Sequence, residues 1–417
     1  MGARGRDVKA MLVAALMAFS LTGAAQIAAP QAVSPSPVLQ SDIMQALTEI
    51  ADGIDKVLLD DAGKARGDYD WRTGAWRDYE AAWHSGQAIE GLLWAYRETG
   101  EKRYLERARR AGDYWAGLEL KDGPFKGMIN AAHGDRLGRL INFTTVTNGS
   151  PGLFHLSLVT TDSRYADVAS RAISWLADNM KVPGHLLYYN ILDPDTGTIW
   201  TDKSPHHDVA KASPTQVARP NIEGSPFLDA CLHLRAMRLC KAHGSLARAT
   251  AQRQGADGLW MEFEPNDPAN GTVHPRFNSW NAEAMLRQYG RTKDKRFLRA
   301  ALATGRANVT MMKADGAFDY SQNVSGKSGS MSPTGSATAF AGILWLGLRA
   351  EGYQEFDPHI HAAARWLIAN RYRANHPDPN LRGLVIERRI KGDSIVQRDL
   401  GSFFAARFLA QYAQAFR

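Results

Sequence analysis

Cysteine is scarce in this sequence, and its scarcity limits the metal chemistry and covalent stabilisation available to the chain. The 417 residues include two cysteines, Cys231 and Cys240, which are too few for a structural zinc site built on thiolates. They lie nine positions apart in one predicted helix, which separates their Cα atoms by about 13 Å. A disulfide needs Cα atoms within about 7 Å, so we expect two free thiols that behave as small buried apolar side chains.

Several motifs of catalysis and cofactor binding are also missing. The sequence contains no HExxH, EF-hand loop, G-x-S-x-G, P-loop or dinucleotide fingerprint, so it indicates neither a metal nor an organic cofactor. Lysine and arginine are spread along the chain without a dense basic run, which argues against nucleic acid as a partner. Beyond the first 25 residues no stretch is long and apolar enough to span a bilayer, so stable membrane insertion is not expected.

The first 25 residues have the pattern of a secretory signal peptide. Basic residues within positions 4–9 precede an apolar segment at 10–25, and Gly23 and Ala25 suit the −3 and −1 positions of a cleavage site. An uncleaved anchor is the alternative, but the short apolar span and the small exit residues favour cleavage. We therefore expect a periplasmic or secreted protein with a flexible leader at 26–40. Cleavage would lower the net charge from +7 to +5, a mild excess that permits an anionic substrate.

A repeat of segment types organises the remaining chain. Six segments share a polar start, a small residue and then an apolar helix, at Glu80–Thr99, Thr144–Thr160, Asn221–Cys240, Asn278–Tyr289, Pro333–Arg349 and Asp399–Phe416. Amphipathic helices alternate with them, at Ser41–Leu59, Tyr104–Leu118, Tyr165–Met180, Ser245–Gln254, Phe297–Met312 and Pro358–Tyr372. Helices that are apolar nearly all round are buried, whereas those with one polar face lie at a surface. The two kinds predict an inner and an outer ring.

The connections between these helices are unequal in length. Connections from inner to outer helices are short, whereas connections from outer to inner helices are long. The long connections include hairpin-like sequences at His185–Trp200 and Gly383–Gln397. This pattern predicts an all-α fold, a single (α/α)6 toroid over residues 41–417, with short β-hairpins in long loops on one face. An open solenoid is the alternative, but its repeats are usually only about 33 to 47 residues long. Glycines near the inner starts, such as Gly86 and Gly335, should let inner helices approach closely.

The long loops and the N-terminal ends of the inner helices share one face of such a toroid, so the cleft should lie there. Candidate residues in this zone are rich in Trp, Arg and Asn, which stack on sugar rings or bind hydroxyls and carboxylates. We predict substrate contacts from Trp71, Trp76, Trp83, Asn221, Arg276, Trp280, Asn281, Arg398 and Asp399. The competing interpretation for each tryptophan is ordinary packing.

The chain resembles the toroidal carbohydrate-active enzymes, which include lyases of alginate and glucuronan, unsaturated uronyl hydrolases and sugar epimerases. The resemblance covers nearly the whole mature chain. It rests on the repeat and on the texts AAWHSGQAIEGLLWAYRETGEKRYLERA (81–108) and YYNILDPDTGTIW (188–200), because no complete catalytic motif of one family aligns. It implies an enzyme whose substrate is a polysaccharide or oligosaccharide.

The resemblance to uronate lyases implies β-elimination. Such a lyase neutralises the uronate carboxylate, removes the C5 proton with a base, often Tyr or His, and protonates the leaving oxygen. Tyr188 and Tyr189 are the candidates for proton transfer, and His84 is an alternative base. Asn148, Arg219, Glu223 and Asn221 are candidates for binding the carboxylate, Glu223 only when protonated.

Three other functions stay open. A glycoside hydrolase needs two carboxylates across one bond, for which Glu223 with Asp399, or Asp70 with Glu223, are candidates. A uronyl or sugar epimerase shares the proton abstraction without cleaving a bond. A glycan-binding protein without catalysis predicts aromatic platforms but no convergent acid and base.

Overall fold

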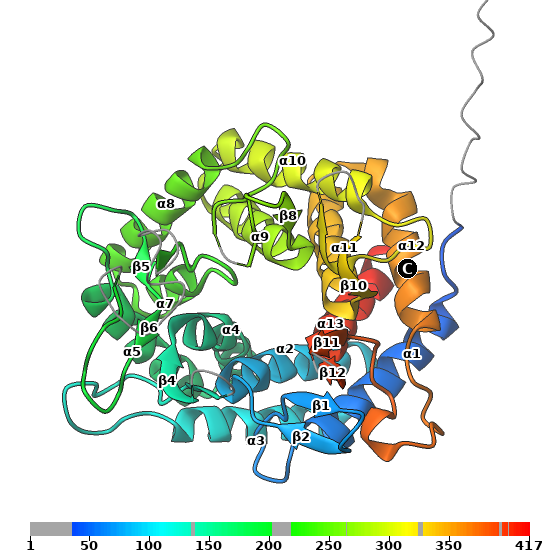
Figure 1. The fold of residues 1–417 in the computed structure, drawn as a ribbon, viewed down its shortest axis with the longest axis horizontal. Helices are drawn as coiled ribbons and strands as arrows, with labels where there is room; N and C mark the ends of the chain where they lie inside the picture. The colour runs from blue at the N-terminus through cyan, green and yellow to red at the C-terminus, as the bar shows by residue number, and fades with distance from the viewer. Residues whose placement is uncertain are drawn as a thin grey trace, which may run out of the picture. The chain divides into compact units, whose positions relative to one another are not determined.

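Two concentric rings of helices form the body of the protein, which lies within one unit from Pro35 to Arg417 (Figure 1). The computed structural model describes residues 36–134, 138–201, 218–263, 265–323, 328–391, 394–398 and 400–417. The predicted signal peptide lies outside the described residues. The inner helices are α2 (Ala81–Thr99), α4 (Phe143–Thr160), α7 (Pro226–Leu234), α9 (Pro275–Thr292), α11 (Gly335–Ala350) and α13 (Leu400–Ala415).

Each inner helix packs against an outer helix that is its neighbour in the ring. The outer helices are α3 (Lys102–Gly117), α5 (Ser163–Asn179), α8 (Met237–Gln252), α10 (Lys295–Met311), α12 (Asp357–Ala369) and α1 (Gln40–Gly53), which a π-helical turn at Ile54–Leu58 extends. The last inner helix, α13, packs against both α11 and α2, while α1 covers α13 from outside. The helices therefore close into a ring, which confirms the predicted (α/α)6 toroid and excludes an open solenoid.

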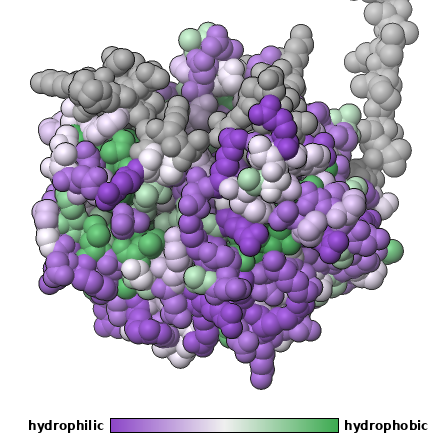
Figure 2. All heavy atoms as spheres, turned by 60° about the horizontal axis from the view of Figure 1, so that its bottom comes forward, coloured by the Kyte–Doolittle hydropathy of each residue, from purple (hydrophilic) through white to green (hydrophobic). Residues whose placement is uncertain are grey.

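The burial of the two kinds of helix follows their sequence patterns. Helix α11 is buried nearly all round, whereas α3 buries one stripe that includes Tyr104, Ala108, Ala111 and Trp115. Outer helices expose their polar faces, and Figure 2 shows a mostly hydrophilic surface on the side of the ring that carries α3. No helix in the described part of the chain is both long and apolar enough to cross a membrane.

Glycines bring inner helices into backbone contact. A Cβ placed on Gly86 of α2 would lie 2.0 Å from the carbonyl oxygen of Gly149 on α4, and a Cβ on Gly152 would lie 2.1 Å from that of Gly86. Gly335 and Gly401 make a similar close approach between α11 and α13. The packing role that the sequence predicts for these glycines is thus confirmed.

Short antiparallel strands occupy the connections from outer to inner helices. They are β1 (Asp68–Asp70), β2 (Ala75–Arg77), β3 (Ala132–Gly134), β4 (Gly138–Asn142), β5 (Tyr188–Tyr189), β6 (Ile191–Leu192), β7 (Ala218–Arg219), β8 (Thr272–Val273), β9 (Asp319–Asn323), β10 (Ser328–Pro333), β11 (Arg388–Lys391) and β12 (Ser394–Arg398). They form sheets in the orders β11-β12-β1-β2, β10-β9-β8, β3-β4-β6 and β5-β7. In the first sheet Asp68 pairs with Arg398, so the first and last long connections lie side by side.

The prediction for the two cysteines is wrong because the third inner helix ends earlier than its sequence indicates. Helix α7 stops at Leu234, Arg235 adopts a left-handed conformation (φ 53°), and the chain reverses into α8 at Met237. Cys231 and Cys240 therefore belong to adjacent antiparallel helices, with Cα atoms 5.2 Å apart, and they form a disulfide. The predicted outer helix at Ser245–Gln254 is the second half of α8.

Candidate active site

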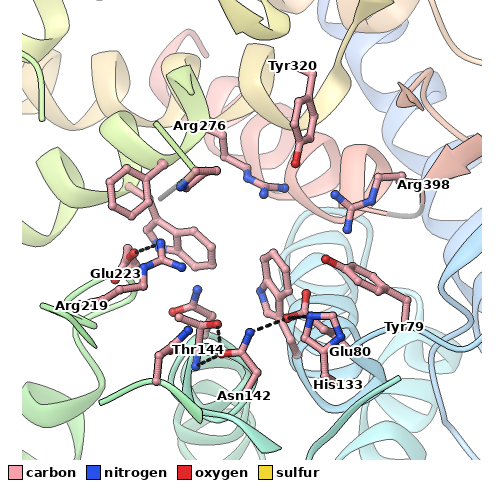
Figure 3. Close-up of a pocket in the computed structure, with 16 residues that line it drawn as sticks. Tyr79, Glu80, His133, Asn142, Thr144, Arg219, Glu223, Arg276, Tyr320 and Arg398 are labelled. Atoms are coloured by element: carbon pink, nitrogen blue, oxygen red, sulfur yellow. Dashed lines mark hydrogen bonds and ion pairs between the residues drawn. The ribbon is translucent and has the colours of Figure 1, made fainter. Parts of the chain in front are cut away.

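A pocket opens at the N-terminal ends of the inner helices, where the sequence places the cleft (Figure 3). Its volume is about 200 Å³, and we call it the loop-side pocket. Its lining side chains come from all six long connections and from the N-terminal parts of α2, α4 and α9. They are Tyr79, Glu80, Trp83, His133, Asn142, Thr144, Asn148, Asn190, Arg219, Glu223, Pro265, Arg276, Phe277, Trp280, Tyr320 and Arg398.

Seven of the predicted site residues meet in this pocket. They are Trp83, Asn148, Arg219, Glu223, Arg276, Trp280 and Arg398. Trp83 and Trp280 stack at the pocket floor, with ring centroids 6.3 Å apart and planes inclined by 26°. Arg276 lies over the Trp83 ring at 5.3 Å. The sequence predicts that residues at the N-terminal ends of the inner helices line the cleft. These seven residues are far apart in the sequence, yet they line one cavity.

Other predicted substrate contacts lie elsewhere. Trp71 and Trp76 pack on the β1–β2 hairpin: Trp71 contacts Tyr372 edge-on, and the indole of Trp76 donates a hydrogen bond to Asn380 (3.1 Å). Asn221 and Asn281 are buried and do not line the pocket. Asp399 lies outside the described residues.

The predicted proton-transfer residues also fall outside the pocket lining. Tyr188 is 4% exposed and packs between Phe143 and Phe227, where burial raises the pKa of its phenol to about 12. Tyr189 is half-buried against an apolar cluster that includes Phe277. Since the two side chains of this short strand are used for packing, the geometry argues against either as the base.

His84 and Asp70 are likewise buried away from the pocket. His84 is fully buried and packs edge-on against Trp83 and Tyr79. Asp70 is fully buried and pairs with Arg77 on the neighbouring strand β2. The alternative base and the first carboxylate of one hydrolase pair thus have structural contacts instead.

Glu80 is the most constrained residue in the pocket. It precedes α2 with a left-handed backbone (φ 44°, ψ 43°), which is rare for a residue with a side chain. Its Oε1 accepts hydrogen bonds from Asn142 Nδ2 (3.2 Å) and Thr145 Oγ1 (3.3 Å). Asn142 is held in turn as the N-cap of α4, since its Oδ1 accepts from the backbone N–H of Thr144. These contacts fix one carboxylate at the pocket wall.

His133 completes this part of the wall. Its Nδ1 lies 2.8 Å from the carbonyl oxygen of Gly134, which can only accept, so Nδ1 carries a proton. Its Nε2 lies 3.5 Å from Oε1 of Glu80. In the neutral tautomer with this proton on Nδ1, the lone pair is on Nε2, the ring nitrogen that lies beside the Glu80 carboxylate.

Arg398, beside Tyr79 in the pocket lining (Figure 3), is anchored by an ion pair with Asp68. Both side chains are almost fully buried, and Arg398 Nε donates to Asp68 Oδ1 at 3.1 Å. The guanidinium lies over the Tyr79 ring at 4.9 Å. Burial and the nearby Glu80 carboxylate raise the pKa of Tyr79 well above its ordinary value, because both disfavour the phenolate. Tyr79 therefore keeps its proton.

Two further arginines reach the same cavity. Arg276 is 7% exposed and lies 3.5 Å from Ser336 Oγ, which donates to the buried Glu387 carboxylate (2.7 Å). Arg219 pairs with Glu223 at 3.3 Å. In Figure 3 the hydroxyl of Tyr320 points into the cavity between the guanidiniums of Arg276 and Arg398. The pocket thus combines cationic groups, two carboxylates, two phenols and an imidazole.

Tyr79, Glu80 and His133 are not among the site residues predicted from the sequence. Tyr79 and Glu80 read as the polar start of an inner helix, and His133 stands in an undistinguished stretch before the second one. Asn148 and Arg276 are found from the sequence because they lie just before or within the first turns of an inner helix. The same criterion also applies to Tyr79 and Glu80. Among the described residues no group of three or more His, Cys, Asp or Glu side chains is arranged to hold a metal ion.

Comparison with solved structures places this geometry within a known architecture. An unsaturated glucuronyl hydrolase specific for heparin is 13% identical and has a TM-score of 0.63, covering 90% of this chain and 96% of that chain. Cellobiose 2-epimerase from Bacillus thermoamylovorans is 12% identical with a TM-score of 0.68, covering 90% and 98%. A D-mannose isomerase is 12% identical with a TM-score of 0.64, covering 91% and 98%.

The chain has the fold of these toroidal enzymes. A scan of protein-family models and a search of curated proteins found no match for the sequence. Identities this low carry the toroidal architecture and not the reaction, so the chemistry of this toroid has to be argued from its own pocket.

Proposed function

We propose that this protein is a saccharide-processing enzyme that cleaves a uronic-acid-containing polysaccharide or oligosaccharide by β-elimination. The observation that carries the proposal is the meeting of Arg276 and Arg398 with the Glu80–His133 pair and the Tyr79 phenol in one cavity. These groups correspond to the three requirements of the reaction, which are charge neutralisation, a base and an acid. No metal or cofactor takes part in the steps below.

The first requirement is to make the C5 proton of the uronate acidic. A carboxylate bound by guanidinium groups withdraws electron density from C5 and stabilises the enolate-like charge that develops there. Arg276 and Arg398 are both more than 90% buried, so their charges are little screened by water. We assign the uronate carboxylate to the space between them.

The second requirement is a base. His133 Nε2 takes the C5 proton, the C5–H electrons form the C4–C5 double bond, and the bond from C4 to the leaving oxygen breaks. The Glu80 carboxylate at 3.5 Å stabilises the imidazolium that results. Asn142 and Thr145 keep that carboxylate in place.

The third requirement is an acid for the leaving oxygen. Tyr79 keeps its proton at neutral pH because its pKa is raised, and its hydroxyl faces the cavity (Figure 3). It donates this proton to the departing sugar oxygen, and the Arg398 guanidinium over the ring stabilises the phenolate. Return of the proton from His133 to Tyr79, through water, restores the starting state.

The test is to incubate the mature protein with a panel of uronate-containing and neutral polysaccharides. β-Elimination produces one conjugated C4–C5 double bond, detected by ultraviolet absorbance, for each new reducing end. Equal growth of both signals on a uronate substrate supports the proposal. New reducing ends without ultraviolet absorbance contradict it.

A glycoside hydrolase is the second candidate, because Glu80 and Glu223 both line the loop-side pocket. One carboxyl group would protonate the leaving oxygen while the other acts as nucleophile or base. Glu223 lies 3.3 Å from Arg219, which holds its carboxylate in the pocket wall, so we assign it the second of these roles. The reducing-end assay above distinguishes the two reactions.

We also propose that the enzyme is exported, on the basis of the signal-like sequence at residues 1–25 and of the Cys231–Cys240 disulfide. Disulfides persist in oxidising compartments such as the periplasm and the extracellular space. N-terminal sequencing of the protein recovered from the periplasm or the medium tests this: a start near Gln26 supports export, whereas an intact Met1 in the membrane fraction contradicts it.

A further inference from the structure

A second cavity lies deeper along the same inner helices. Its volume is about 240 Å³, and we call it the basal pocket. On α2 it is lined by Gln87, Glu90 and Trp94, whereas the loop-side pocket uses Trp83 in the first turn. Trp280 lines both pockets. The basal pocket is therefore a second chamber that shares Trp280 with the loop-side pocket.

Three ion pairs line this chamber, and each joins two inner helices. Glu90 of α2 pairs with His155 Nδ1 of α4 (3.1 Å). Asp229 of α7 accepts two hydrogen bonds from Arg287 of α9 (2.5 and 3.1 Å). Glu283 of α9 pairs with Arg407 of α13. Each carboxylate thus has a cationic partner.

The charges of the chamber cancel when His155 is protonated. Burial would lower the pKa of His155, but the Glu90 carboxylate outweighs burial and raises it. Burial likewise opposes ionisation of Glu90, yet His155 and nearby arginines lower the pKa of that carboxyl to about 2. Burial raises the pKa of Asp229, although its carboxylate accepts two hydrogen bonds from Arg287. With all three pairs ionised, the chamber has no excess charge with which to select an ionic ligand.

Aromatic walls complete the chamber. Trp94, Phe154 and Trp280 line it together with the ion pairs. Sugar rings have apolar C–H faces that stack on aromatic rings, and hydroxyl edges that both donate and accept hydrogen bonds. Guanidinium groups only donate and carboxylates only accept, so paired side chains of both kinds can satisfy such an edge. A neutral sugar ring fits both the chemistry and the volume.

The ion pairs also hold helices together, but this role does not account for the cavity. At Gly86 and Gly149, one turn above Glu90, α2 and α4 meet in backbone contact. Buried ion pairs stabilise a fold little compared with apolar packing of similar volume, so charged side chains around open space are a poor way to close a ring. Their arrangement around a void is better explained by a ligand.

We propose that the basal pocket binds a neutral saccharide ring, stacked on Trp94 and hydrogen-bonded to the Glu283–Arg407 and Asp229–Arg287 pairs. This proposal is independent of the reaction in the loop-side pocket, because it concerns binding of an uncharged sugar and needs no turnover.

The experiment measures binding of glucose, mannose and cellobiose to the mature protein by calorimetry and by saturation-transfer NMR. Trp94→Leu should weaken the affinity for the sugar that binds by up to about tenfold, because stacking is lost. Glu283→Gln should also weaken it, because the carboxylate that accepts from the sugar is lost. Trp175→Leu removes a tryptophan of outer helix α5 and is the matched control; Arg276→Met removes a group of the loop-side pocket. Both should bind as the wild type does. Thermal melts confirm that each variant is folded.

The proposal is overturned if none of the three sugars binds saturably. It is also overturned if Trp94→Leu binds the sugar with wild-type affinity. If Arg276→Met abolishes binding in that case, the sugar occupies the loop-side pocket instead. Should Glu283→Gln fail to fold, Trp94→Leu still decides, because that half-buried side chain lies outside the ion pairs.

Discussion

His133 and Glu80 lie side by side in one wall of the loop-side pocket, with Nε2 of the imidazole 3.5 Å from Oε1 of the carboxylate. The backbone reinforces this pairing, since the N–H of Glu80 donates to the carbonyl oxygen of His133 at 2.7 Å. Two connections, one before α2 and one before α4, are thereby joined at the residues that the proposed reaction uses.

Replacing His133 by Gln should abolish most of the proposed activity. The amide keeps a similar shape but cannot take a proton, and a general base contributes roughly 10²- to 10⁴-fold to the rate. We expect kcat to fall within this range while binding of the substrate, measured by calorimetry, changes little. A variant with full turnover would remove His133 from the mechanism.

Glu80 and His133 should act as one unit, which a double-mutant cycle can measure. If the carboxylate works by stabilising the imidazolium, Glu80→Gln slows wild-type turnover but has little further effect on His133→Gln. Asn148→Ala serves as a pocket control whose effect should add to that of His133→Gln. Additive effects of Glu80→Gln and His133→Gln would show that the two groups work separately.

The disulfide should stabilise the junction of α7 and α8. Closing so short a loop is worth about 2–3 kcal/mol in the chain-entropy account, so Cys231→Ser should lower the free energy of unfolding by about this amount. Peptide mapping without reductant should recover Cys231 linked to Cys240. Two unlinked thiols in protein from an oxidising compartment would contradict the pairing.

The contact between Gly86 and Gly149 should tolerate no side chain. Gly86→Ala places a methyl group against a backbone carbonyl, and we expect a loss of about 1–3 kcal/mol or more. Gly290→Ala, inside α9 with no atom near its Cβ position, is the matched control; it should be neutral or gain up to about 1 kcal/mol. Chemical denaturation compares the two, and equal effects would disprove the close approach.

Stability should depend on pH through the Glu90–His155 pair. The lowered pKa of Glu90 adds stability above its unfolded value near pH ~4.3, which is lost as pH falls towards about 2. The raised pKa of His155 adds stability below its unfolded value near ~6.5, which is lost as pH rises through the folded value. The Glu90–His155 pair therefore makes its full contribution to the free energy of unfolding between about pH 4.5 and 6.5.

His155→Gln tests this dependence. The difference in Tm between wild type and variant should be largest near pH 5.5 and should shrink as the pH approaches 9. A difference that stays constant from pH 5 to 9 would mean that His155 contributes by packing alone.

The fold could be predicted because its signals are periodic and repeated. The apolar sequence of α11 indicates a buried inner helix, and the amphipathic pattern of α3 indicates an outer helix at the surface. The unequal lengths of the connections indicate that the two rings of helices close into a toroid. The break between α7 and α8 could not be predicted, because no glycine or proline marks it. Arg235 adopts the left-handed conformation there, and only the packing of neighbouring helices selects that reversal.

The site could be predicted in part for a similar reason. Arg276 and Trp280 lie in the first turns of an inner helix, so the rule of position finds them. Tyr188 and Tyr189 attract attention as a pair in a long loop. Yet the Tyr188 ring packs against Phe227, and Tyr189 packs against the apolar cluster that includes Phe277. Position in a loop does not determine which way a strand turns its side chains. The left-handed backbone of Glu80 is set by the folded structure around it, so it could not be predicted from the sequence either.

The ion pair between Asp68 and Arg398 spans 330 positions, so one wall of the loop-side pocket is made by opposite ends of the chain. A growing polypeptide cannot assemble that wall until nearly all of it has been synthesised. Under the proposed export of the unfolded chain, the two ends would meet only after the chain has crossed the membrane. The loop-side pocket would then form only outside the compartment in which the chain is synthesised.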